Sequence, residues 1–326
     1  MSRTDCHIST KRYEYEAVYR HAASSLVAPY FSPIWLDAVC GKEGWQSLTI
    51  SFSSGHILLF PFYTPVSGCL SQPPFTQYLG PLLIPSPRAT MSFADKRLAI
   101  EVLVEHFPQL DCCSFHTPPD FSDWLPFYWK GFEQTTRYTY ILQLDSPDPL
   151  SSLQMEANQL LRRKLRQSER AGLSFVEGGS FSDLIAMVRL SLDRSPETAK
   201  LRYTDRLESL TQAMRQQDMG EIYCCSKDGR IVASVFMVRG GTRTYYIAGG
   251  QDTTECKDAL AYCLYRAICT QVSRNGILSV DFEGSMLRGV EFFFRSFGAV
   301  QTPYFAIRRG RMSLSKRLCR KLFTHP

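Results

Sequence analysis

Histidine is nearly absent from the second half of this sequence. Five of the six histidines lie at or before His116, and the sixth is His325. The stretch 117–324 therefore offers no imidazole as a general base or as a metal ligand. This absence excludes a histidine-based catalytic triad and a histidine-ligated metal from that stretch.

The cysteines lack the spacing of a metal site or of a disulfide framework. There are eleven of them, no two are arranged as C-x-x-C, and four form the doublets Cys112-Cys113 and Cys224-Cys225. An odd number at irregular spacing is not typical of a disulfide-stapled scaffold. We expect most of them to be buried, reduced thiols that pack as small apolar groups, and we expect no metal cofactor.

Long apolar runs are missing as well. No stretch approaches the roughly 18 apolar residues that span a bilayer, and the first 21 residues have no apolar core of the kind found in signal peptides. We therefore expect a cytoplasmic protein with no transmembrane segment. The 326 residues, 44% of them hydrophobic and 21% charged, suit a globular chain of two domains.

Positive charge is scarce in the first half and abundant in the second. Residues 1–145 carry 10 Lys+Arg and 13 Asp+Glu, whereas residues 146–326 carry 27 and 18, so the net charges are −3 and +9. The basic half suggests an anionic partner such as tRNA, a phosphate group or a membrane surface, or else a solvated basic face.

The motif SPDP (Ser146–Pro149) after the strand-like run Arg137–Asp145 reads as a linker. It predicts two domains, 1–145 and 146–326. After the linker, the patterns predict a capped helix to about Ala171, a short strand, two helices, a three-strand meander, a helix from about Thr254, and then strand, helix and strand. The fold class is therefore α/β (α+β).

The first half ends with a similar order of elements. Ser86-Pro87 predicts the start of a helix, followed by a strand, an aromatic helical stretch and a long strand. A shift of 167 residues aligns aromatic and glycine positions of the two halves. The aligned pairs are Phe115 with Phe282, Phe127 with Phe294, Gly131 with Gly298 and Tyr138 with Phe305. We interpret this as a duplication that produced two similar domains.

The segment VDFEGSMLRGVEFFFRSFG (Val280–Gly298) carries a family resemblance. It resembles the late part of the FemAB/FemX-type aminoacyltransferases and of related GNAT-superfamily acyltransferase domains. NQLLRRKLRQSERAGLSF resembles the basic helix that opens the second domain of that group, and YYIAGG resembles the acyl-donor region. The resemblance implies two tandem GNAT-like domains, the first of them degenerate, with an activated acyl donor and an amine acceptor, which would be a small molecule or a peptidyl amine.

The sequence departs from both donor types of that group. Its members that use acyl-CoA usually carry Arg/Gln-x-x-Gly-x-Gly/Ala before a helix, whereas AGGQDTTE keeps only Gly249 and Gly250. Members that use aminoacyl-tRNA carry a long helical arm, for which residues 180–219 leave no room. Three hypotheses stay open: an N-acyltransferase with acyl-CoA as donor, a tRNA-dependent aminoacyltransferase acting on a peptidoglycan precursor, and a non-catalytic ligand-binding module.

Asp281 and Glu283 end a predicted strand and are the candidate catalytic residues. Residues i and i+2 of a strand point to the same face, so each carboxylate would raise the pKa of the other and suit one of them to accept a proton from an ammonium group. The first half has Ser114 and His116 at the equivalent positions. A structural role for Asp281, as a helix cap or as a partner of Arg295, is the alternative.

A donor pyrophosphate would lie at the N-terminus of the helix predicted from Thr254. The candidate donor-binding residues are Gly249, Gly250, Thr253, Thr254 and Lys257. An ordinary strand–helix turn, with Asp252 or Thr254 as the cap, explains the same residues.

Basic and aromatic residues complete the candidate site. The residues assigned to substrate binding are Arg162, Arg163, Arg194, Arg295 and Tyr304. The basic C-terminal tail, with Leu314, Leu318 and Leu322 on one helical stripe, would contact an anionic surface or RNA, or dock on the domain.

Overall fold

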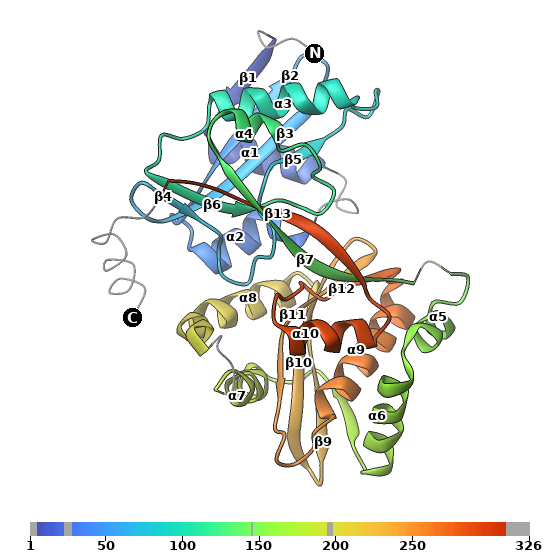
Figure 1. Cartoon of the computed structure of the whole chain (residues 1–326). Coiled ribbons are helices and arrows are strands. Elements are labelled where there is room, and N and C mark those ends of the chain that lie inside the picture. The colour runs from blue at the N-terminus through green and yellow to red at the C-terminus, as the bar shows by residue number, and fades with distance from the viewer. Residues whose placement is uncertain (1–4, 23–27, 145, 194–197, 311–326) are drawn as a thin grey trace. The chain divides into compact units, whose positions relative to one another are not determined.

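The computed structural model describes residues 5–22, 28–144, 146–193 and 198–310 (Figure 1). The chain divides into two compact units, Met1–Arg137 together with Pro303–Pro326, and Tyr138–Thr302. The first domain was expected to end at residue 145 and the second to keep the whole C-terminus. The division differs because two strands, β7 (Glu133–Gln143) and β13 (Val300–Gly310), each contain residues of both units.

The first unit is a mixed sheet with helices beside it. β4 and β6 are parallel, and the other pairings of the unit are antiparallel. Its strands are β1 (Cys6–Ser9), β2 (Trp45–Phe52), β3 (Ile57–Val66), β4 (Cys69–Ser71), β5 (Leu82–Ile84) and β6 (Cys112–His116). Its helices are α1 (Arg12–His21), η1 (Pro29–Phe31), α2 (Pro33–Cys40), α3 (Phe93–Glu105) and α4 (Leu125–Trp129).

The core of the first unit follows from strand alternation. Leu48, Ile50 and Phe52 lie on one face of β2 and pack with Phe115 and Phe127 in one buried cluster. Burial of such side chains stabilises the fold by roughly 1.5–3 kcal/mol each. The helix α3 begins after the capping box formed by Ser92 and Asp95, later than the Ser86-Pro87 start predicted from the sequence. That prediction was wrong because Ser92 supplies a complete cap, with bonds in both directions.

The second unit is also a mixed sheet between helices. β11 and β12 are parallel, and the other pairings are antiparallel. Its strands are β8 (Ser174–Glu177), β9 (Gly220–Lys227), β10 (Arg230–Gly240), β11 (Arg243–Gln251) and β12 (Ser279–Asp281). Its helices are α5 (Pro149–Glu156), α6 (Gln159–Arg170), α7 (Phe181–Leu192), η2 (Thr198–Tyr203), α8 (Thr204–Gln216), α9 (Ala259–Asn275) and α10 (Arg288–Ser296).

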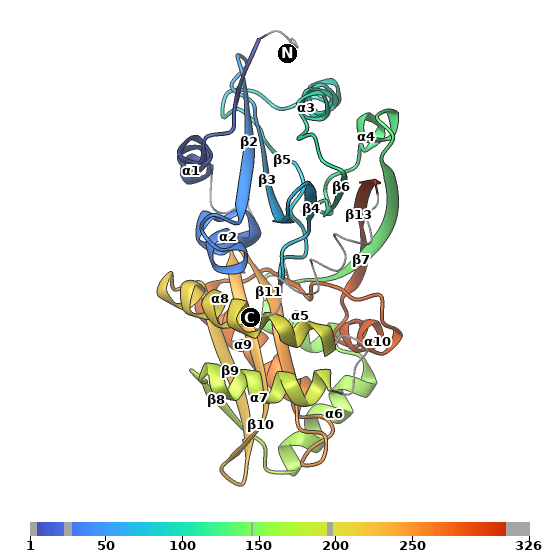
Figure 2. The same cartoon turned by 90° about the vertical axis from the view of Figure 1, so that its left-hand side faces the viewer.

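Helices cover both faces of this second sheet (Figure 2). Alternate residues of β10 point to opposite faces, and Val235 and Met237 pack with Cys263 and Leu264 of α9 in the main core. The helix α7 packs over the other face, against β10 and β11. The single helix predicted up to Ala171 is two helices, because Asn158 begins α6 as an N-cap whose side chain accepts from Leu161 N.

The strand registers support the duplication. In the first unit Cys112 of β6 lies opposite Gly310 of β13, and in the second unit Ser279 of β12 lies opposite Gln143 of β7. Residue 279 follows 112 by 167 positions, and 310 follows 143 by the same 167. The 167-residue offset found in the sequence therefore relates β6 to β12 and β7 to β13, residue by residue, and the two strand pairs have the same register. The expected α/β (α+β) fold class with two similar domains is confirmed.

Cys69 and Cys112 form a disulfide between the parallel strands β4 and β6. This pair corrects the expectation of reduced thiols for two of the cysteines, because the two lie opposite each other, with Cα atoms 4.9 Å apart. The structure pairs none of the eight other cysteines in the described ranges with one another in a disulfide. Within those ranges no helix combines the length and the apolar character that crossing a bilayer requires.

Candidate functional site

The parallel strands β11 and β12 stay together for only three residue pairs. Arg243, Thr244 and Tyr245 lie beside Ser279, Val280 and Asp281. β12 ends at Asp281, whereas β11 continues along β10 to Gln251. The two strands therefore part at their carboxyl ends, which is where ligands bind in open α/β sheets.

A β-bulge lies on β11 just beyond this point. Tyr246 is opposite Met237 and Ala248 is opposite Phe236, so Ile247 is an extra residue in the register with β10. A bulge bends its strand, increases the local twist and takes one residue out of the regular ladder. The bulge lies directly beyond the last residue pair that β11 forms with β12, so residues 246–248 lie where the two strands part.

Asp281 is fully buried at the end of β12. Its Oδ1 accepts from the Thr139 hydroxyl at 2.5 Å and from the backbone N–H of Glu283 at 2.9 Å. Burial, with the negative charge of Asp281 as the next cause, raises the pKa of the neighbouring Tyr245. A buried carboxylate needs hydrogen-bond donors of this kind. Since one of them is the backbone N–H of Glu283, Asp281 fixes the turn that follows β12. It does not pair with Arg295, which forms an ion pair with Glu291 instead.

Glu283 lies in this turn with a left-handed backbone, φ +58°, and Gly284 follows at φ +62°. A Cβ at Gly284 would lie 2.1 Å from the carbonyl oxygen of Tyr138, so only glycine fits there. The expected placement of Asp281 and Glu283 on one strand face is wrong, because β12 ends at Asp281. Glu283 is half-buried, and the Asp281 carboxylate fixes its backbone.

Gly249 and Gly250 lie inside β11 and are explained by packing. A Cβ at Gly250 would lie 2.0 Å from the backbone oxygen of Met187 in α7. A Cβ at Gly249 would lie 2.5 Å from the hydroxyl of Tyr246. The two glycines let α7 and the Tyr246 ring approach the strand closely, a reason that the sequence alone did not reveal.

Thr253, Thr254 and Lys257 lie in the loop between β11 and α9. The helix predicted from Thr254 begins only at Ala259. Asp252 delays it, because its Oδ1 accepts from both the N–H and the hydroxyl of Thr254, at 2.9 and 2.6 Å. An aspartate that bonds its own backbone in this way stabilises a turn in place of a helix.

The two arginines of α6 that were assigned to substrate binding differ in their surroundings. Arg162 donates to the backbone oxygens of Ala157 and Met155 at the end of α5, at 2.7 and 3.1 Å. Arg163 is exposed. Arg194 lies outside the described residues, as does the basic tail with its leucine stripe.

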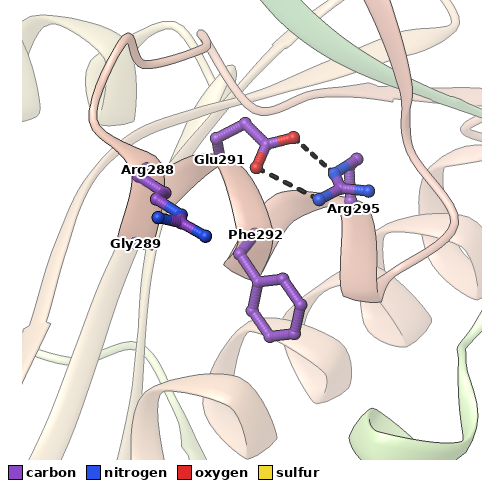
Figure 3. A pocket seen from close by; sticks show the side chains of 5 residues that line it. All are labelled: Arg288, Gly289, Glu291, Phe292 and Arg295. Carbon is purple, nitrogen blue, oxygen red and sulfur yellow. Dashed lines mark hydrogen bonds and ion pairs between the residues drawn. The ribbon is translucent and has the colours of Figure 1, made fainter.

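Arg295 lines a pocket of about 560 Å³ beside α10, together with Arg288, Gly289, Glu291 and Phe292 (Figure 3). The Glu291 carboxylate faces the Arg295 guanidinium and compensates its charge. The ring of Phe292 is half exposed. This pocket offers apolar surface and the guanidinium of Arg288, and Gly289 leaves open space beside the helix.

Tyr304 belongs to the first unit. Its hydroxyl accepts from Gln77 Nε2 at 2.7 Å and from Arg137 Nε at 3.3 Å, and its ring contacts His116. The assigned substrate-binding residues are therefore divided between the units, with Tyr304 inside a buried polar network of the first.

Buried His116 predicts an acid-sensitive first unit. Its Nδ1 donates to Gln77 O at 3.0 Å, and burial, with the positive charge of Arg137 as a smaller cause, lowers its pKa from 6.5 to about 4. Between pH 6.5 and 4 the imidazole of His116 is protonated in the unfolded chain but stays neutral in the folded chain. The free energy of unfolding therefore falls as the pH drops from 6.5 towards 4. We expect a loss of about 2 kcal/mol at pH 5 relative to pH 7.

Urea denaturation of wild type and His116→Gln at both pH values measures this effect. The variant should lose less stability between the two pH values than wild type. An equal pH dependence in the two proteins would contradict the assignment to His116.

Sequence reasoning missed three residues of the candidate site. Thr139 holds Asp281 from a distant part of the chain, Ile247 forms the bulge, and Gln251 bonds the first turn of α9. Only Gln251 carried a local signal, since it follows the glycine pair directly. Among the described residues, no group of three or more His, Cys, Asp or Glu side chains is arranged to hold a metal ion.

The comparisons with known proteins agree with this geometry. Residues 157–295 match the family model described as acetyltransferase (GNAT) domain. The fold resembles that of FemX, with a TM-score of 0.64 at 11% identity over 97% of this chain and all of that one. It also resembles L-PGS from Bacillus licheniformis, with a TM-score of 0.54 at 14% identity over 97% of this chain and 98% of the other.

A third similar structure is a tandem GNAT protein from the clavulanic acid biosynthesis pathway. Its TM-score is 0.53 at 10% identity over 95% of this chain and all of that one. No curated protein matched the sequence. The parted strands and the bulge lie within the range that matches the family model. The match to the acetyltransferase (GNAT) domain covers residues 157–295, and the expected resemblance of the fold to the FemX-like tandem group is confirmed.

Proposed function

We propose that the protein is an N-acyltransferase that moves an acyl group from a thioester donor, such as acyl-CoA, to an amine. The observation that carries this proposal is the parting of β11 and β12 at the Ile247 bulge. Acyl transfer requires a hydrogen-bond donor that stabilises the developing oxyanion, and a fixed direction of attack by the amine on the carbonyl carbon. In this proposal the bulge meets the first requirement, with an amide N–H of residues 246–248 as the hydrogen-bond donor to the oxyanion.

Glu283 takes the proton of the acceptor in this proposal. The Glu283 carboxylate takes one proton from the ammonium group of the acceptor and later releases it to solvent. The neutral amine nitrogen then forms a bond to the carbonyl carbon, the carbon–sulfur bond breaks, and a second proton of the nitrogen passes to the leaving thiolate. Asp281 acts as a positioning residue in this proposal, because its buried carboxylate accepts from the backbone N–H of Glu283 and fixes it.

Ligand-induced stabilisation tests the donor class. A non-hydrolysable acyl thioester analogue at 100 times its Kd should stabilise the folded chain by about 2.7 kcal/mol. For a chain of this size we expect the melting temperature to rise by several degrees. No shift with any acyl chain from acetyl to decanoyl would count against a thioester donor.

Transfer itself is measured with a panel of amines, from small molecules to peptides with a free amino group. Release of free thiol that depends on the amine is the expected result. The alternative donor is aminoacyl-tRNA with a peptidoglycan precursor as the acceptor, and transfer from charged tRNA alone would favour it. Absence of transfer from every donor would favour a non-catalytic binding module.

A further inference from the structure

The loop before α9 bears on how a donor is recognised, and the inference drawn from it rests on the proposed function. A CoA thioester carries a pyrophosphate, and unpaired N–H groups at a helix N-terminus are the usual ligands of such an anion. In the second unit such a pyrophosphate would lie between the end of β11 and the start of α9.

Three backbone N–H groups at this place, those of Leu260, Thr254 and Cys256, already donate within the chain. Leu260 N, in the first turn of α9, donates to Gln251 Oε1 at 2.8 Å. The N–H and hydroxyl of Thr254 donate to Asp252 Oδ1, and Cys256 N donates to Asp252 O at 3.2 Å. To bind these N–H groups, a phosphate oxygen would have to displace the oxygens of Asp252 and Gln251, which lie in or beside the same loop and stay close to the N–H groups.

Gln251 is itself fixed in this capping position. Its Nε2 donates to Lys257 O at 3.1 Å while its Oε1 accepts from Leu260. The side chain therefore bridges both ends of the loop, and its displacement would break two hydrogen bonds.

The charges of the loop do not favour an anion either. Asp258 occupies the N-cap position of α9, where its carboxylate takes the favourable interaction with the helix dipole. Lys164 pairs with Asp258 at 3.0 Å, and Lys227 donates to Glu255 O. The three acids of the loop, Asp252, Glu255 and Asp258, equal in number the lysines Lys257, Lys164 and Lys227, so these six residues carry no net positive charge for a pyrophosphate.

We infer that the enzyme recognises its donor by the acyl-pantetheine thioester and gains no affinity from the nucleotide of CoA. The donor class that fits is an acyl thioester of phosphopantetheine on a carrier without a pyrophosphate at this loop, such as a carrier protein. The same balance of charge disfavours the closely spaced phosphates of an RNA donor.

Truncated donors test the inference on the full chain. The value of kcat/KM is measured with acetyl-CoA, acetyl-phosphopantetheine and acetyl-pantetheine, with one amine acceptor. We expect acetyl-CoA and acetyl-phosphopantetheine to agree within about 3-fold. An advantage of 100-fold or more for acetyl-CoA would overturn the inference and leave the proposed function standing.

A variant adds an independent readout. Gln251→Ala frees the N–H of Leu260, and we expect the preference for acetyl-CoA over acetyl-phosphopantetheine to rise about 10-fold. Gln167→Ala removes an exposed glutamine on α6 and should leave the preference unchanged. A preference that stays the same in Gln251→Ala would contradict the role assigned to this cap.

The remaining outcomes separate the two proposals. Transfer from aminoacyl-tRNA but from no thioester would overturn the inferred donor class. Absence of transfer from all of these donors would overturn the proposed function itself.

Discussion

Replacement of Glu283 by glutamine should lower kcat/KM for acyl transfer by about 100-fold or more. Glutamine keeps the size and hydrogen-bonding capacity of the side chain but cannot take the proton of the ammonium group, and general-base catalysis typically contributes 10²–10⁴-fold. Glutamine tolerates the left-handed backbone as well as glutamate does, so the free energy of unfolding should change little. A steady-state assay of thiol release between pH 6 and 10 measures the effect.

The pH profile separates a base from a mere binding group. Removal of the base should make the residual rate rise with pH, as the free amine becomes abundant without help from the enzyme. Glu208→Gln, on the exposed face of α8, is the matched control and should behave as wild type. A rate within 3-fold of wild type in Glu283→Gln would remove Glu283 from the mechanism.

Replacement of Gly250 by alanine should destabilise the fold by about 3 kcal/mol or more. The new Cβ would lie 2.0 Å from the backbone oxygen of Met187 and 2.7 Å from the backbone nitrogen of Val188. Backbone atoms cannot turn aside as the end of a flexible side chain can, so α7 must shift from the sheet, and such overpacking is costly. Urea denaturation followed by circular dichroism measures the loss.

Gly289→Ala is the control for this substitution. Gly289 lies in α10 without a left-handed backbone, and apart from its chain neighbours and the backbone of its own helix no atom lies within 4 Å of the new methyl group, so alanine should be neutral or slightly stabilising. A Gly250→Ala protein of normal stability that has lost donor binding would return Gly250 to the donor site, where the sequence had placed it.

The sequence predicted the fold better than the site for a physical reason. The order of elements, the fold class and the 167-residue duplication follow from periodic patterns and turn residues that are local in the chain. The contribution of β7 and β13 to both units was not predictable, because their sequences look like those of ordinary strands and only their pairing partners reveal which unit each end belongs to. The domain boundary was therefore expected at the SPDP linker.

The candidate site depends on contacts that no local pattern encodes. Asp281 was recognised as a notable carboxylate, but its donor Thr139 is 142 residues away in the sequence. Gly249 and Gly250 resembled a phosphate-binding turn, whereas a distant helix explains Gly250. The bulge at Ile247 appears only when the register with β10 is known, because Ile247 is an ordinary strand residue.

The most direct test of the account is an amide chemical-shift map of the second unit's strands in the full chain, recorded with a non-hydrolysable acyl-pantetheine analogue. Hydrogen bonding of the acyl carbonyl to the bulge predicts the largest downfield amide proton shift among residues 246–248. The amides of Thr254, Cys256 and Leu260 should move little, since their partners lie within the chain. Saturable binding that leaves residues 246–248 unshifted and moves the α9 loop would contradict the central claim.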